Sequence, residues 1–243
     1  MREEISWKEY LSLRPRDLKK PEYKHLWLLL FWPLELVYFT LMGRVLHEYH
    51  PVICAMDGQI PFLEGFVLPY LSWFVCIAFT LLYTLRRNVP VFRRFSWYVV
   101  VTFGVAGLAF LLWPSTFPGR PVEPGWPASV ADYYAAMPRK NLFTWMLSFV
   151  YFTDPPRNVF PSEHVVVALG MLCAALQDKR LRRPAFAVPY VTLQLLICVS
   201  VVFVKQHSIL DVFAALPLSL LGILGCFVPW KKLRCRDKSD GQT

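Results

Sequence analysis

Two residues four positions apart, His207 and Asp211, have the types and the spacing of a catalytic pair. On a helix this spacing places both side chains on one face, where the carboxylate can accept a hydrogen bond from one imidazole nitrogen. Such a bond fixes the tautomer of the ring and raises the basicity of the other nitrogen, which a nucleophilic histidine needs. The alternative is a buried His–Asp pair that serves packing alone.

Four more polar residues precede this pair at the mouths of apolar segments. His164 is placed to act as a general acid that protonates a leaving oxygen while His207 attacks phosphorus. Arg120 and Lys205 would bind the phosphoryl oxygens, with the Ser162 hydroxyl and the free N–H groups of the helix that follows it as further donors. Because no cysteine or histidine spacing resembles a metal site, we expect neither a metal nor another cofactor.

The elements that position these residues are predicted to be membrane-spanning helices. The chain has 243 residues, of which 56% are hydrophobic and 18% are charged, so a bilayer is a better solvent for it than water. Six apolar runs approach the roughly 20 residues that a crossing requires. They are residues 26–42, 66–85, 95–114, 160–177, 184–204 and 212–230, the first containing Glu35 and the fourth Glu163 and His164. The predicted fold is therefore an all-α bundle of six transmembrane helices.

The positions of the basic residues predict the orientation of this bundle. Residues 1–25, 86–94, 178–183 and 231–243 hold 20 of the 26 lysines and arginines, and six helices place all four segments on one side. Since basic loops stay in the cytoplasm, we expect a multi-pass protein of the cell membrane with both termini cytoplasmic and the candidate site extracytoplasmic. The dispersed basic residues fit anionic lipid headgroups rather than nucleic acid.

Three parts are expected along the chain. Residues 1–25 read as a cytoplasmic interfacial segment, residues 26–230 as the membrane domain and residues 231–243 as a cytoplasmic tail. The outer segment at residues 115–159 is long enough to be functional, and residues 141–153 within it suit a short interfacial helix. The outer loop at residues 43–65 holds polar residues that could contact a headgroup, bind a metal or face water: His47, Glu48, His50, Asp57 and Gln59.

Three stretches resemble the motifs of the type 2 phosphatidic acid phosphatase (PAP2) family, which read KxxxxxxRP, PSGH and SRxxxxxHxxxD. The matching residues are Arg120-Pro121, Pro161-Ser162-Glu163-His164, and Ser200 with His207 and Asp211. The resemblance implies a PAP2-like core in which His207 forms a phosphohistidine, Asp211 orients it, and His164 acts first as acid and then as base. It also implies that no metal is required.

Three positions depart from these motifs. Trp113 occupies the position of the first-motif lysine, Glu163 that of the PSGH glycine, and Val201 that of the third-motif arginine. Two phosphate-binding cations are therefore missing, although Lys205 could restore one positive charge from another direction. Similar losses occur in the branch that resembles inositol phosphorylceramide and sphingomyelin synthases, in which a headgroup alcohol accepts the phosphoryl unit.

We therefore expect a lipid phosphatase that hydrolyses a phosphomonoester or diphosphate of a lipid. A lipid phosphotransferase using the same His207 intermediate is the alternative, and a non-enzymatic lipid-binding or transport protein is a third reading. Glu163 could adjust the acidity of His164, contact a hydroxylated headgroup or point to water. Glu35, inside an apolar run, needs either a structural partner or a substrate role, because an isolated charge in the bilayer is costly.

Overall fold

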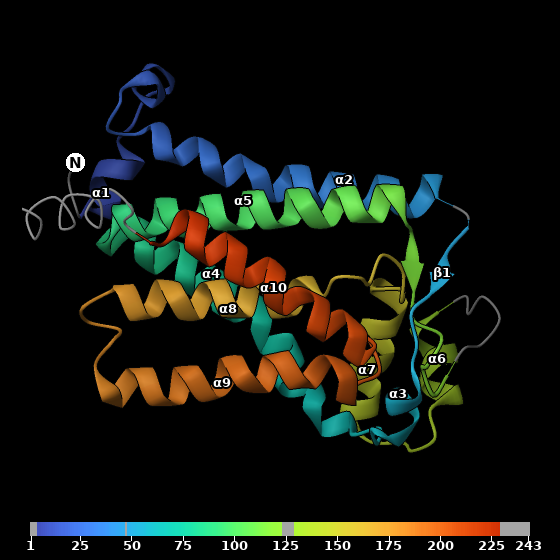
Figure 1. Ribbon diagram of the computed structural model, residues 1–243. Helices are drawn as coiled ribbons and strands as arrows, with labels where there is room; N and C mark the ends of the chain where they lie inside the picture. Colours follow the sequence, from blue (N-terminus) through green and yellow to red (C-terminus); the bar gives the residue numbers. More distant parts are fainter. Residues whose placement is uncertain (1–3, 47, 123–128, 229–243) are drawn as a thin grey trace, which may run out of the picture.

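The computed structural model describes residues 4–46, 48–122 and 129–228. The predicted cytoplasmic tail at residues 231–243 and His47 lie outside the described residues. Within the described part the chain is almost entirely helical (Figure 1). The helices are α1 (Trp7–Leu11), η1 (Pro15–Lys19), η2 (Lys24–Leu30), α2 (Phe31–Val45), α3 (Ala55–Gln59), η3 (Glu64–Phe66), α4 (Val67–Arg87), α5 (Val89–Leu112), α6 (Val130–Ala136), α7 (Leu142–Thr153), α8 (Glu163–Gln177), α9 (Pro184–Phe203) and α10 (Ile209–Cys226).

Five of these segments are long and apolar enough to cross a membrane. They are Lys24–Gly43, Glu64–Arg87, Val89–Leu112, Pro184–Phe203 and Ile209–Cys226. The remaining predicted helix, the fourth in the chain, is α8; it is apolar but has only 15 residues, or about 22 Å of helix. The prediction of an all-helical membrane bundle is confirmed, with α8 as a shorter central member.

Helix α8 forms the centre of the bundle. It packs against α4, α5, α9 and α10, and Val165, Val166 and Val167 are fully buried. Its contact with α5 is close at Gly170, where an added Cβ would lie 2.3 Å from the Tyr98 ring. The Tyr98 hydroxyl also donates to the carbonyl of Val166 at 2.8 Å, so this tyrosine holds α5 and α8 in register.

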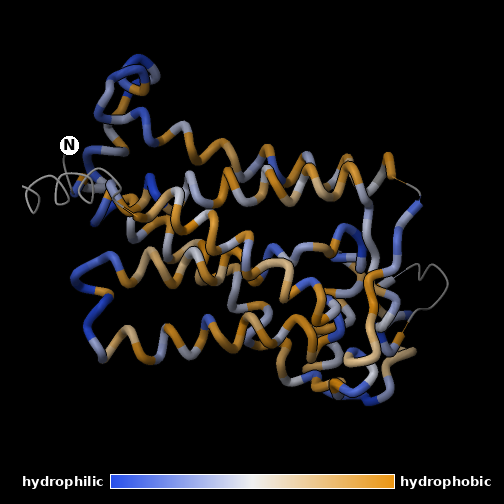
Figure 2. The backbone as a smooth tube through the Cα atoms, viewed as in Figure 1, coloured by the Kyte–Doolittle hydropathy of each residue, from blue (hydrophilic) through white to orange (hydrophobic). Residues whose placement is uncertain are grey.

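One end of the bundle gathers the hydrophilic turns between the long helices (Figure 2). Glu4 forms ion pairs with Arg87, the last residue of α4, and with Arg180, in the α8–α9 turn. The Asn88 amide donates to Asp178 at 2.9 Å and joins the α4–α5 and α8–α9 turns. Two of the four basic segments that the sequence assigns to one side therefore meet at this end of the bundle. We call it the basic end.

The opposite end, which we call the site end, carries the starts of α8 and α10. Helices α3, α6 and α7 gather there, and α7 runs across the direction of the spanning helices (Figure 1). The short helix expected at residues 141–153 is present as Leu142–Thr153. Two short strands that the sequence did not predict, β1 (His50–Pro51) and β2 (Ser115–Thr116), pair in parallel and join the two outer connections.

Candidate active site

His207 lies just before α10 and is held through a single ring nitrogen. Its Nδ1 lies 3.1 Å from Oδ2 of Asp211 and 3.0 Å from the carbonyl oxygen of Val159. Because a carbonyl oxygen only accepts hydrogen bonds, the proton resides on Nδ1. In the neutral ring the other nitrogen, Nε2, then carries the lone pair that a nucleophile needs. The structure thus brings together the pair that the sequence singled out.

The start of α10 is fixed by a residue from the first outer connection. Asp57 in α3 accepts hydrogen bonds from the Ser208 hydroxyl at 2.6 Å and from the Ile209 N–H at 2.8 Å. It also accepts one from the N–H of Cys54 at 2.8 Å. Burial acts to raise the pKa of Asp57, but these hydrogen bonds outweigh it and lower the pKa below its ordinary value. Asp57 therefore positions Ser208 and Ile209, which lie between His207 and Asp211 in the chain.

His164, the second residue of α8, lies between two aromatic rings. Its ring centroid is 4.3 Å from that of Trp73 and 4.5 Å from that of Tyr70, both nearly parallel to it. The centroid of His207 is 5.9 Å away, so the two histidines are neighbours. His164 is 8% exposed, and its Nε2 has no hydrogen-bond partner within the described part of the chain. The ring is held by stacking and remains available for proton transfer.

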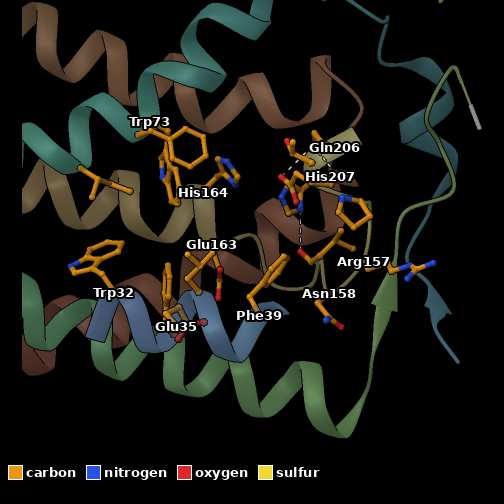
Figure 3. A pocket seen from close by; sticks show the side chains of 18 residues that line it. Trp32, Glu35, Phe39, Trp73, Arg157, Asn158, Glu163, His164, Gln206 and His207 are labelled. Atoms are coloured by element: carbon orange, nitrogen blue, oxygen red, sulfur yellow. Dashed lines mark hydrogen bonds between the residues drawn. The ribbon is translucent and has the colours of Figure 1, made fainter. Parts of the chain in front are cut away.

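Both histidines line one cavity of about 430 Å³ between α2, α4, α8 and the segment before α8 (Figure 3). Its polar lining consists of Glu35, Thr153, Asp154, Arg157, Asn158, Glu163, His164, Gln206 and His207. Its apolar lining includes Trp32, Phe39, Trp73, Phe74, Ile77 and Phe103. A cavity that is mostly apolar with a few convergent polar groups suits a lipid with a polar headgroup.

Arg157 is the arginine that lines this cavity in the described structure. Its guanidinium lies over the ring of Tyr49, 5.2 Å from the centroid. No motif position in the sequence points to Arg157. The sequence feature that could have indicated Arg157 is its closeness to a motif, because it lies seven residues before His164. It is also next to Asn158, whose φ of 55° turns the chain toward Val159.

Arg120, expected to bind phosphate, lies behind the cavity wall rather than on it. Its guanidinium donates to the carbonyls of Tyr151 at 3.3 Å and Asp154 at 2.6 Å, and also to Oε1 of Gln206. It lies 4.2 Å from the centroid of the Tyr151 ring. Burial lowers the pKa of this guanidinium. Arg120 therefore supports Gln206, which does line the cavity.

Lys205 and Ser162 are likewise absent from the cavity lining, and the Ser162 Oγ has no hydrogen-bond partner among the described residues. The Lys205 ammonium donates to the carbonyls of Asp57 at 2.7 Å and Ile60 at 2.6 Å. Its φ of 55° is unusual for a residue with a side chain and turns the ammonium toward the outer connection. The Ser162 hydroxyl is fully buried, and its N–H donates to the carbonyl of Asp211 at 3.2 Å. Both residues tie the starts of α8 and α10 to their surroundings.

Sequence reasoning missed a polar network behind the two histidines. The Tyr70 hydroxyl donates to Asp154 at 2.8 Å, and the Gln206 amide donates to Tyr70 at 3.3 Å. Tyr70 is also one of the rings stacked on His164. The network thus joins the residue before His207 to the support of His164, and its members come from α4, the end of α7 and the α9–α10 turn.

Glu163 and Glu35 face the same cavity from α8 and α2 (Figure 3). Each has a buried Oε1 that makes no hydrogen bond to any residue the structure describes. Glu163, which replaces the PSGH glycine, therefore points into the cavity rather than into open water. Glu35 has no structural ion-pair partner among the same residues.

Comparison with known proteins identifies the family. The chain matches the model of the PAP2 superfamily over residues 59–225, well over half of its length. No curated protein and no solved structure gives a significant match. The matched region contains α4 to α10 almost in full, together with both histidines, Asp211 and Arg157. The chain belongs to the PAP2 superfamily.

Proposed function

We propose that this protein is a membrane lipid phosphatase in which Nε2 of His207 is the nucleophile. The observation that carries the proposal is the fixed tautomer of His207, with the Val159 carbonyl and Asp211 both on Nδ1. Superfamily members are generally phosphatases or phosphotransferases, which supports the same chemistry. The substrate class is a phosphomonoester or diphosphate of a lipid, since the cavity is largely apolar.

The reaction proceeds in two halves. In the first, Nε2 of His207 attacks phosphorus, the P–O bond to the lipid breaks, and His164 donates a proton to the leaving oxygen. In the second, His164 takes a proton from a water molecule, whose oxygen attacks phosphorus and breaks the P–N bond. Inorganic phosphate leaves, and both histidines return to their initial protonation states. Asp211 stabilises the positive charge that His207 gains during attack.

The proposal assigns the phosphoryl oxygens to Arg157 rather than to Arg120, Ser162 and Lys205. Arg157 lines the cavity, whereas Lys205 donates to backbone carbonyls, and Arg120 to backbone carbonyls and the Gln206 side chain. We retain Arg120 as a positioning residue that acts through Gln206, and Lys205 as one that holds the His207 segment. Ser162 would act through its backbone, at the start of α8.

We place the site on the extracytoplasmic side of the cell membrane, with both termini in the cytoplasm. The supporting observation is that His164 and His207 lie at the starts of α8 and α10, at the site end, whereas Arg87 and Arg180 lie at the basic end. Basic loops are retained in the cytoplasm. A lipid in the outer leaflet would then reach the cavity from the side.

A lipid phosphotransferase is the second candidate, near the inositol phosphorylceramide and sphingomyelin synthase branch. The observation that favours it is Glu163, because a carboxylate in the cavity is unfavourable for a free phosphate product but can bind a headgroup. In that case an alcohol replaces water in the second half-reaction, and the phosphoryl unit leaves as an ester.

Release of inorganic phosphate from phosphatidate by the purified protein tests the proposal. We expect release without an added alcohol and in the presence of a strong chelator, and loss of at least a hundredfold in His207→Ala. His50→Ala is the matched control, since His50 is an exposed histidine at the same end that stacks on Trp113. Release that depends on an added alcohol would favour the transferase, and release retained in His207→Ala would refute the proposed nucleophile.

A further inference from the structure

We propose that Ser115 is a positioning residue for the nucleophile, which fixes the ring of His207 through the backbone carbonyl of Val159. The inference rests on the proposed function, since it takes Nε2 of His207 as the attacking atom. It deepens that function by naming the residue that sets the ring before a substrate binds. Ser115 lies in β2, after α5, and does not line the cavity, so its effect on the reaction has to pass through another group.

Ser115 accepts hydrogen bonds from three consecutive backbone N–H groups. Its carbonyl oxygen accepts from the N–H of Asn158 at 2.6 Å. Its hydroxyl oxygen accepts from the N–H groups of Val159 and Phe160, both at 3.0 Å. A hydroxyl oxygen has two lone pairs, so these two hydrogen bonds use both of them. We call residues 158–160 the acceptor turn, and all three of its N–H groups are bound by one residue.

The acceptor turn needs this support because its backbone is unusual and buried. Asn158 has a φ of 55°, in the left-handed region that residues with a Cβ adopt at a cost. Ser115 is 0% exposed, Asn158 6% and Val159 4%, so water cannot replace the hydrogen bonds between them. A buried N–H group without an acceptor is strongly unfavourable. The contacts with Ser115 therefore select this conformation of the turn over others.

The acceptor turn presents one carbonyl to the nucleophile. The oxygen of Val159 lies 3.0 Å from Nδ1 of His207, and Oδ2 of Asp211 lies 3.1 Å from the same nitrogen. A carboxyl group accepts from a protonated nitrogen when ionised and donates to a bare one when protonated, whereas a carbonyl only accepts. The Val159 carbonyl is therefore the contact that excludes the tautomer with its proton on Nε2. That tautomer has no lone pair on Nε2 with which to attack phosphorus.

Strand pairing gives Ser115 a fixed place beside the turn. In the pairing of β1 with β2, the N–H of His50 donates to the carbonyl of Pro114 at 2.8 Å. The N–H of Val52 donates to the carbonyl of Thr116, also at 2.8 Å. These two hydrogen bonds lie on either side of Ser115 in the chain. The first outer connection thereby holds the serine that holds the acceptor turn.

The test is the tautomer of His207 in the full chain in detergent, without substrate. NMR of the ring nitrogens in protein labelled at histidine reports it, and His207→Ala identifies the signals. The wild type should carry the proton on Nδ1, and Ser115→Ala should add a population with the proton on Nε2. Its kcat should fall by about tenfold or more, because the wrong tautomer is inactive. KM should stay within about twofold, because the cavity lining is unchanged.

Thr116→Val is the matched control. It removes a hydrogen bond from the same strand to the same segment, that of the Thr116 hydroxyl to the carbonyl of Pro156 at 2.6 Å, and none to the acceptor turn. It should leave the tautomer and kcat unchanged. An unchanged tautomer in Ser115→Ala would overturn the proposal. So would an equal change in both variants, since any loosening of β2 would then have the same effect.

Two further measurements keep the proposal testable if Ser115→Ala does not fold. Ser115→Cys keeps the shape of the side chain with a weaker acceptor, so it should show a smaller change of tautomer in the same direction. No change in that variant would also overturn the proposal. In the wild type, the three N–H groups of the acceptor turn should exchange slowly with solvent deuterium, and fast exchange would contradict the contacts with Ser115.

The tautomer and the chemistry can fail separately. An unchanged tautomer in Ser115→Ala, together with a phosphohistidine on His207 during turnover, would refute the role of Ser115 alone. A changed tautomer in Ser115→Ala, with no phosphohistidine in the wild type, would refute the proposed chemistry and leave the role of Ser115 in fixing the ring intact.

Discussion

At the scale of single residues, the position of one proton determines what His207 can do. The carbonyl of Val159 can only accept, so it holds the proton on Nδ1 even before Asp211 is considered. The sequence predicted the Asp211 contact from the i, i+4 spacing. It could not predict the carbonyl, because Val159 comes from a segment 48 residues away and reaches His207 through the left-handed turn at Asn158.

Arg157 and Arg120 should respond differently to removal. Arg157→Ala should raise KM by about 10- to 100-fold with little change in thermal unfolding, because a charge-assisted hydrogen bond to a bound ligand contributes about 1.5–3 kcal/mol. Arg120→Ala should instead destabilise the fold by roughly 2–4 kcal/mol, since it leaves buried carbonyls unpaired. Phosphate-release kinetics and thermal unfolding of both variants check this. If Arg120→Ala unfolds at the same temperature as the wild type but has a raised KM, Arg120 rather than Arg157 binds the phosphate.

At the scale of elements, α3 should control the start of α10 through Asp57. Asp57→Ala should lower the free energy of unfolding by about 1–2 kcal/mol, as expected for loss of a helix-capping carboxylate. It should also lower kcat. Ser208→Ala should reproduce part of the effect, because it removes one of the three donors to Asp57. Wild-type kcat in Asp57→Ala would show that α3 plays no part in positioning His207.

The stability from Asp57 should depend on pH in a defined direction. Its pKa is lower in the folded protein than in the unfolded chain. The carboxylate therefore stabilises the fold fully above the ordinary aspartate pKa of about 3.9, and this contribution is lost as the pH falls through the folded value. Thermal unfolding of the wild type and of Asp57→Asn between pH 3 and pH 7 measures this contribution of the Asp57 carboxylate. We expect the difference between them to shrink toward acid pH, and a constant difference would contradict the assignment.

The contact between α5 and α8 should tolerate no side chain at Gly170. Gly170→Ala places a Cβ 2.3 Å from the fully buried Tyr98 ring, which should destabilise the fold by about 1–3 kcal/mol. Gly104→Ala in α5 is the control, because its Cβ would have no neighbour within 4 Å. We expect Gly104→Ala to be neutral or slightly stabilising. Equal unfolding temperatures for the two variants would contradict the packing described for α8.

The helices were predictable because each apolar run is long, and only the first and the fourth contain charged residues. The predicted start of the last run, at residue 212, is three residues late, because Ile209 to Asp211 lie in the first turn of α10, where a polar cap and a carboxylate mask the pattern. The shortness of α8 and the pairing of β1 with β2 were not predictable. Both depend on contacts between segments far apart in the chain, which hydropathy does not record.

At the scale of the whole molecule, the basic end and the site end should face opposite sides of the membrane. A cysteine introduced at exposed Asp132, near the site end, should react with a membrane-impermeant thiol reagent in intact cells. One at exposed Lys179, in the α8–α9 turn, should react only after permeabilisation. Replacing Cys54 and Cys235 by serine removes the native thiols predicted to lie outside the bilayer. The reverse labelling pattern would place the site in the cytoplasm.

The candidate site could be predicted in part, for reasons that hold across the molecule. The sequence pointed to His164, His207 and Asp211, because their side chains are typical of catalysis and lie in short motifs. The roles of Arg120 and Lys205 could not be read from the sequence, because a basic residue at a helix mouth can point into a cavity or toward carbonyls behind it. The direction in which each points is decided by the packing of other elements.

Trapping the covalent intermediate tests whether His207 is the nucleophile. Purified protein is quenched during turnover of phosphatidate labelled in the phosphate, and the modified residue is identified by mass spectrometry under alkaline conditions. We expect an acid-labile, base-stable phosphoryl group on His207 that is absent from His207→Ala and disappears on a chase with unlabelled substrate. Turnover by wild type with no phosphohistidine, or with the label on another residue, would contradict it.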